Sequence, residues 1–268
     1  LGPGRANKVL VYDLKGNYLP DEVIRFGEIV HKSQIWVDYD KKNVVVVTLP
    51  FSANVNSNFA INKNVCWVQN RDGDIVHRIP VNHYGLIGDY SNALVARRNV
   101  DAISFSISEI PMLRTRPDTL YHYDAVKNII TPCFTIDHVV SENQNASTVL
   151  YETSRSYWAY VTLYPNDISS SAFSVRLTTF NVCVSKKDGN VRRIDRFTDP
   201  LLGLSHLFLM MNNGYICISY DPLELMDALD KVLTQTDLEL DVRKRATDLR
   251  NSLHENDNDI LIIGKLKQ

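Results

Sequence analysis

Apolar and polar residues alternate through much of the first 220 positions of this chain. In residues 100–109 one face of an extended segment carries Ile103, Phe105 and Ile107, and the other carries Ser104, Ser106 and Ser108. This period of two is typical of a strand that covers a core on one side and faces water or a partner on the other. The same pattern recurs along the chain and predicts a body built from strands.

Turn-forming residues separate these apolar segments and predict hairpins. The turns are expected at 41–43, 71–74, 186–190 and 212–214, where Gly, Asn and Asp tolerate the positive φ of tight turns. The apolar pattern of residues 173–185 changes phase near Thr178 and Thr179, which predicts a β-bulge there. Residues 21–31 fit a short helix that begins at Asp21, although Gly27 weakens this interpretation.

The pattern changes at Asp221 and Pro222, where an N-cap residue followed by Pro predicts the start of a helix. Two amphipathic helices are expected, near 222–234 and 237–254, and a last strand follows them. The first helix is expected to bury Leu223, Met226, Leu229 and Leu233. The second is expected to bury Val242, Ala246, Leu249 and Leu253.

These patterns predict a mainly β fold: an antiparallel β-sandwich, either one large or two smaller, with a C-terminal pair of amphipathic helices. The expected division is a β body over 1–220, with a possible seam near 111–118 or 141–147, and an acidic helical tail with a final strand over 221–268. No repeat of 20 to 50 residues is evident in the sequence, which argues against a propeller or a solenoid.

Charge is distributed unevenly over the 268 residues. The formal net charge is −2, but residues 221–259 carry −6 and the remainder carries +4. The β body is therefore only mildly basic, less than a dedicated nucleic-acid binder requires. The 44% apolar and 22% charged residues are typical of a globular protein. No apolar run is long enough for a transmembrane segment and no secretion signal is visible, so a cytoplasmic or virion location is expected.

Motifs for catalysis and cofactor binding are absent from the sequence. There is no nucleophile elbow, no phosphate-binding glycine loop and no pair of His residues at metal-ligand spacing, so we expect no cofactor, no metal, no nucleotide and no enzyme activity. The alternative is a hydrolase with a dispersed site around His122, Asp137 or His206. The four cysteines lie in apolar, strand-like segments without CxxC spacing, which favours buried, reduced thiols over disulfides.

Basic residues gather in one predicted hairpin and are the first candidate for a binding site. They are Lys186, Lys187, Arg192, Arg193 and Arg196. A protruding basic ribbon is suited to phosphates of RNA or to anionic lipid headgroups. The alternative is a solvated edge hairpin whose charges prevent edge-to-edge pairing. Arg97, Arg98, Arg114 and Arg116 are candidates to extend the patch.

Aromatic residues form the second candidate, a surface made by Tyr157, Trp158, Tyr160 and Tyr164 within one predicted strand. Exposed rings of this kind stack on sugars or bases or form protein interfaces, whereas buried rings belong to the core.

Together these patterns favour a non-enzymatic structural or assembly protein of viral type. It is expected to form homo-oligomers and to contact RNA or a membrane surface through the basic hairpin. A glycan- or ligand-binding β module is the non-enzymatic alternative. The support is indirect: 23 Asn residues against 12 Ala, and a β body with a helical appendage.

Overall fold

The computed structural model describes several stretches of the chain, and every structural statement below concerns them. They are residues 6–30, 33–38, 40, 42–48, 63–84, 94–98, 102–107, 118–137, 144–165 and 177–266. The predicted seam at 111–118 and the residues Arg114 and Arg116 lie outside them, except for Asp118. Arg97 and Arg98 are described by their backbone only.

Three four-stranded antiparallel sheets make up most of the described structure, and each of their strands pairs with its neighbour in the sequence. The first sheet contains β3 (Gln34–Asp38), β4 (Asn43–Val47), β5 (Asn64–Asn70) and β6 (Ile75–Pro80). The second contains β7 (Leu94–Arg98), β8 (Ile103–Ile107), β9 (Asp118–Asp124) and β10 (Ile129–Ile136). The third contains β11 (Gln144–Glu152), β12 (Ser156–Pro165), β13 (Thr178–Ser185) and β14 (Val191–Ile194).

Smaller elements complete the chain on both sides of these sheets. The chain starts with β1 (Ala6–Val9), η1 (Pro20–Glu22) and β2 (Ile24–Val30), and η2 (Asn82–Tyr84) follows the first sheet. After the third sheet come β15 (Phe197–Thr198), β16 (Ser205–His206), β17 (Met210–Asn212), β18 (Tyr215–Tyr220), α1 (Pro222–Leu233), α2 (Leu240–Ser252) and β19 (Ile260–Lys265). Strands β17, β18 and β19 form a last three-stranded sheet.

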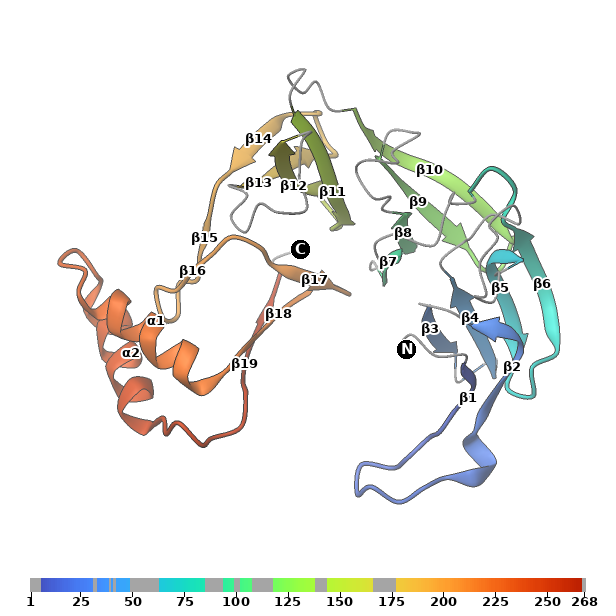
Figure 1. The fold of residues 1–268 in the computed structure, drawn as a ribbon, viewed down its shortest axis with the longest axis horizontal. Coiled ribbons are helices and arrows are strands. Elements are labelled where there is room, and N and C mark those ends of the chain that lie inside the picture. The colour runs from blue at the N-terminus through green and yellow to red at the C-terminus, as the bar shows by residue number, and fades with distance from the viewer. Residues whose placement is uncertain are drawn as a thin grey trace.

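The sheets pack face to face and follow one another around an arc (Figure 1). Val45, Val68 and Phe105 belong to the apolar cluster between the first and second sheets, and Leu120 and Leu150 to the cluster between the second and third. The mainly β, antiparallel fold with sheets packed face to face is therefore confirmed. The second sheet packs against a neighbouring sheet on each face, and Ser104 of β8 is buried rather than exposed to water.

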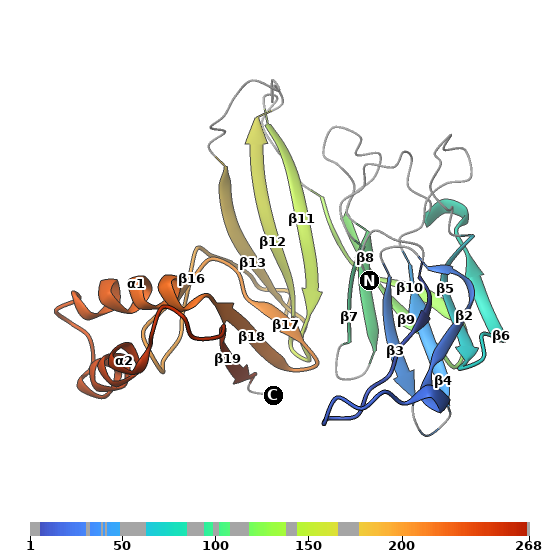
Figure 2. The same cartoon turned by 60° about the horizontal axis from the view of Figure 1, so that its bottom comes forward.

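The first strand of each four-stranded sheet lies toward the inside of the arc and the last toward the outside (Figures 1 and 2). Consecutive four-stranded meanders arranged in this way resemble the blades of a β-propeller. The lack of a sequence repeat therefore did not exclude a repeated architecture, because the repeat is one of strand order and each sheet uses different residues.

The helix expected at 21–31 is wrong. Pro20–Glu22 form the short 3-10 turn η1, His31 lies outside the described residues, and Ile24–Val30 form the strand β2. Its Ile24 and Val30 are buried in the cluster that covers the outer face of the first sheet. A direct backbone contact accounts for the difference: a Cβ atom on Gly27 would lie 2.0 Å from the carbonyl oxygen of Gly73. The β5–β6 turn thus packs on the bare backbone of β2, and this long-range contact overrides local helix propensity.

The β-bulge expected near Thr178 is not observed within the described part of β13, which begins at Thr178. Its register against β12 runs without a shift from Thr178 opposite Leu163 to Ser185 opposite Ser156. Residues 173–176, which carry the other phase of the pattern, lie outside the described residues. A register shift does occur in β10, between Pro132 and Phe134, and it leaves Cys133 without a residue paired opposite it on β9.

Both C-terminal helices and the final strand are confirmed. Asp221 caps α1 by accepting a hydrogen bond from the Leu223 N–H at 2.9 Å. The apolar stripe of α1 is rotated from the expected one, since its buried members are Pro222, Leu225, Leu229 and Val232, and Leu223 is half exposed. Strand β19 returns to pair with β18. None of the helices in the described stretches is both long and apolar enough to cross a membrane.

Candidate anion-binding groove and the buried carboxylate beside it

An open groove of about 830 Å³ lies at one end of the third sheet. Two neighbouring turns form it, one joining β11 to β12 and the other joining β13 to β14, together with the adjoining strand ends. It is lined by Ser154, Arg155, Ser156, Cys183, Ser185, Lys186, Lys187, Asp188, Asn190 and Arg192. Four of these ten side chains are basic and one is acidic, so the groove favours an anion.

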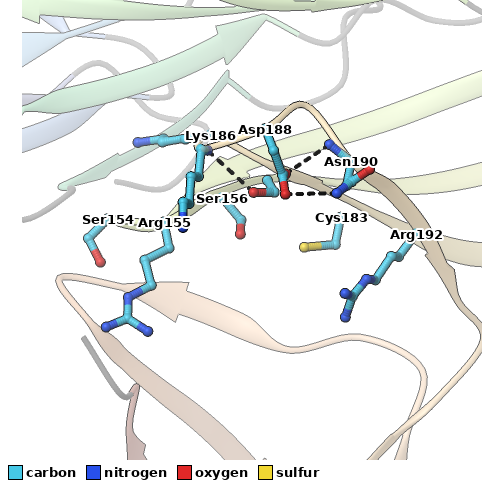
Figure 3. A pocket seen from close by; sticks show the side chains of 10 residues that line it. Ser154, Arg155, Ser156, Cys183, Lys186, Asp188, Asn190 and Arg192 are labelled. Atoms are coloured by element: carbon cyan, nitrogen blue, oxygen red, sulfur yellow. Dashed lines mark hydrogen bonds between the residues drawn. The ribbon is translucent and has the colours of Figure 1, made fainter.

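The two turns are held by hydrogen bonds that the local sequence supplies. Asp188 accepts from the backbone and side-chain N–H groups of Asn190, at 3.1 and 2.7 Å, and Gly189 takes a φ of +71°. The Lys186 N–H donates to the Arg155 carbonyl at 2.9 Å, which ties the two turns together. Figure 3 shows Arg155 and Arg192 extending on either side of the Cys183 thiol.

The structure divides the five residues of the predicted basic hairpin. Lys187 and Arg192 line the groove. Arg193 points to the other face of the strand, where it lies 4.2 Å from the centre of the Phe180 ring and pairs with Asp195 at 2.8 Å. Arg196 donates to the Ser205 hydroxyl at 3.4 Å. The alternation of a strand therefore separates Arg192 from Arg193.

Lys186 also lines the groove, but its ammonium donates to Oε1 of Glu152. It lies 4.9 Å above the Tyr157 ring as well. The Glu152 side chain is only 1% exposed, whereas that of Lys186 is 25% exposed. This ion pair joins the basic hairpin to the last residue of β11.

Glu152 receives two further hydrogen bonds, and both come from the second sheet. The Ser104 hydroxyl donates to Oε2 at 2.7 Å, and Nε2 of His122 donates to the same oxygen at 2.5 Å. Ser104 and His122 are opposite each other on β8 and β9, so one face of the second sheet delivers both donors. These hydrogen bonds form a polar cluster within the otherwise apolar interface between the second and third sheets.

Burial alone would raise the pKa of Glu152, but the hydrogen bonds from His122, Lys186 and Ser104 outweigh it and lower that pKa to about 2. Burial, with the negative charge of Glu152 nearby, raises the pKa of the Cys133 thiol to about 11. A thiol with a raised pKa is a poor nucleophile at neutral pH. The Ser104 hydroxyl donates to the Glu152 carboxylate rather than to His122. His122 is therefore not placed to activate Ser104 as a nucleophile. The arrangement is suited to holding charges in place.

Residues of the expected dispersed hydrolase site lie apart. His206, in β16, lies in a different part of the arc from β9, which carries His122 (Figure 1). It bonds to the Tyr220 hydroxyl at 3.1 Å through Nδ1. Asp137 follows the end of β10, and His122 pairs with Thr131. Asp137 is six residue steps from Thr131 along the chain, which places it about 20 Å from the position opposite His122. Within the described stretches no group of three His, Cys, Asp or Glu side chains is placed to hold a metal ion.

The four aromatic residues of β12 divide between its two faces. Tyr157 stacks on Phe134, with ring centres 4.8 Å apart, at the interface with the second sheet. Trp158 and Tyr160 point the other way, toward Phe197 and Phe208. Tyr164 is buried. The four rings therefore do not form one continuous surface.

Three residues of this region were not identified from the sequence: Arg155, Glu152 and Ser104. Arg155 lies in a turn of another hairpin, and its proximity to Lys186 depends on strand pairing. Glu152 is the single carboxylate of β11, and its partners are 30 to 48 positions away. Ser104 was visible only as one member of an alternating strand.

All four cysteines lie in strands and carry free thiols. Their expected burial is confirmed for Cys66 alone: Cys133 and Cys183 are half-buried, and Cys217 is exposed. A comparison with protein-family models finds no match for this chain, and a comparison with curated proteins finds no relative.

Proposed function

We propose that this protein is a ligand-binding β module that holds a small anionic ligand in the groove of the third sheet. The observation that carries the proposal is the convergence of Arg155, Lys187 and Arg192 on one concave space. Guanidinium groups recognise phosphate, sulfate and carboxylate oxygens through paired N–H donors. The hydroxyl groups of Ser154 and Ser156, which also line the groove, offer further donors.

The shape and lining of the groove favour a small ligand over single-stranded RNA. Its volume of about 830 Å³ falls in the range of small-molecule sites. No aromatic side chain lines it, so it offers no ring on which bases would stack. The proposed ligand therefore carries anionic groups on a compact body, such as a sulfated or phosphorylated sugar.

The assembly function expected from the sequence remains a prediction. Self-association, a viral origin, a membrane-surface role and the absence of enzyme activity rest on sequence patterns alone. RNA and anionic vesicles are accordingly comparison ligands in the binding experiment, and tight binding of either in preference to the sugar would replace the proposed ligand.

The proposal is tested by fluorescence anisotropy with a labelled, sulfated heparin-type tetrasaccharide. Arg192→Ser is expected to weaken binding at least about tenfold, because a charge-assisted hydrogen bond contributes roughly 1.5–3 kcal/mol. Arg193→Ser is the matched control, since it removes the same charge one residue away on the other face of β14. Equal losses in the two variants would show that binding follows overall charge and not the groove.

A further inference from the structure

Lys186 lies beside the groove, but its charge is committed elsewhere. Its ammonium is held by Glu152 and by the face of the Tyr157 ring, 4.9 Å from the ring centre. Arg155, Lys187 and Arg192 line the groove with Lys186, and the carboxylate that balances the charge of Lys186 lies outside this lining.

We propose that Glu152 withholds Lys186 from the groove and so determines how strongly the groove binds anions. This inference rests on the proposed function of the groove. Glu152 is a specificity-determining residue in this scheme: it contacts no ligand, and it acts through the lysine that it holds. A ligand with a second anionic group competes with Glu152 for the Lys186 ammonium.

The hydrogen bonds of Glu152 allow Lys186 to leave. Lys186 bonds to Oε1, whereas Ser104 and His122 both donate to Oε2. The carboxylate thus keeps two donors from the second sheet when Lys186 turns away. A buried charge that loses its partner is strongly destabilised, and these two donors reduce that penalty.

Lys186 is also the mobile partner of the pair. Its ammonium is carried on a flexible four-carbon stem, and its side chain is 25% exposed, against 1% for Glu152. Lys186 follows Ser185 directly and lines the groove, so the stem that carries its ammonium begins at the groove wall. Release of Lys186 adds one full positive charge to the groove.

The variant Glu152→Gln tests the inference. Gln has nearly the same shape, carries no charge, and turns an amide N–H₂ toward the ammonium or the other donors, so it no longer retains Lys186. We expect Glu152→Gln to bind the sulfated tetrasaccharide about three- to tenfold more tightly at low salt, as one added charge near an exposed site predicts. The gain is expected to disappear in Glu152→Gln with Lys186→Met. Lys186→Met alone is expected to change binding less than about twofold, because each contact that Lys186 gains with the ligand is offset by the loss of its ion pair with Glu152.

Each outcome decides between the two proposals. A folded Glu152→Gln that binds as the wild type does, or a Lys186→Met that weakens binding as much as Arg192→Ser does, overturns the withholding role but leaves the groove as a binding site. A wild type that binds no anionic probe overturns both. Circular dichroism and urea unfolding report whether each variant folds.

A second measurement uses the wild-type protein and does not depend on the folding of Glu152→Gln. An ammonium held in an ion pair exchanges its protons slowly enough to give a ¹⁵N-correlated NMR signal, which Lys186→Met would identify as that of Lys186. We expect this signal to shift or vanish as the tetrasaccharide saturates the groove. An unchanged Lys186 signal at saturation contradicts the inference.

Discussion

At the scale of single residues, the informative side chains are those whose partners come from distant parts of the chain. Glu152 is the main example. Its three hydrogen-bond donors lie 48, 30 and 34 positions away, on two different sheets. No local pattern marks this glutamate, and its properties follow from the donors that the fold brings to it.

The low pKa of Glu152 predicts a loss of stability in acid. Because the folded-state pKa is about 2 and the ordinary value is 4.5, the unfolded chain takes up the proton first as the pH falls. The contribution of the ionised Glu152 to the free energy of unfolding is therefore complete above about pH 5 and is lost progressively toward pH 2. Its size is on the order of 3 kcal/mol as an upper bound, at 1.36 kcal/mol for each pKa unit.

Urea unfolding between pH 7 and pH 3 measures this dependence. Glu152→Gln is expected to unfold more easily at pH 7 and to show a flatter dependence on pH than the wild type. Glu255→Gln, which changes an exposed carboxylate near the C-terminus, is the control and is expected to keep the wild-type slope. Parallel pH profiles for the wild type and Glu152→Gln would contradict the assignment.

At the scale of elements, sequence patterns succeeded where one period extended over a whole segment. Alternation and turn residues identified the hairpins around 41–43, 71–74, 186–190 and 212–214, and the Asp221 cap identified α1. The failure at 21–31 has a physical cause, because β2 is held by a backbone contact with a turn more than 40 residues later. The rotated stripe of α1 has a similar origin, since Leu202, Leu204 and Ala246 determine which face is covered.

The contact between Gly27 and Gly73 predicts that Gly27→Ala is strongly destabilising. The added Cβ atom would lie 2.0 Å from a backbone oxygen, which has no flexible end that could move aside. We expect a loss of at least about 2 kcal/mol in the free energy of unfolding, measured with urea. Gly264→Ala in β19 is the control, since nothing lies within 4 Å of its added Cβ, and it is expected to change stability by less than about 0.5 kcal/mol.

At the scale of the whole molecule, the separation of charge along the chain is the feature that the sequence alone makes visible. Residues 221–259 carry −6 and the rest carries +4. Acidic residues occupy exposed positions on α1, among them Glu224, Asp227 and Asp230. Under the assembly hypothesis, we expect these helices to dock on the mildly basic body of a second copy.

We therefore expect any self-association to weaken as salt is added. Light scattering at about 0.05 M and about 0.5 M NaCl measures the mass, because salt at the higher concentration screens exposed charges beyond a few ångströms. A larger mass at low salt is the expected result. A monomer at both concentrations would remove the assembly function from consideration, and association that strengthens with salt would indicate apolar contacts instead.

The sequence by itself determined the β class, most of the hairpins, the two C-terminal helices and the location of basic residues in one hairpin. These features depend on neighbours within a few positions, where periodicity and turn chemistry act directly. The tertiary structure decided which basic residues face a common groove, which of them is neutralised, and that Arg155 joins them. Those outcomes depend on strand register and on the packing of sheets, through which a carboxylate at position 152 meets a serine at 104, a histidine at 122 and a lysine at 186. Such contacts leave no trace in local sequence because each partner is set by the fold and not by its neighbours.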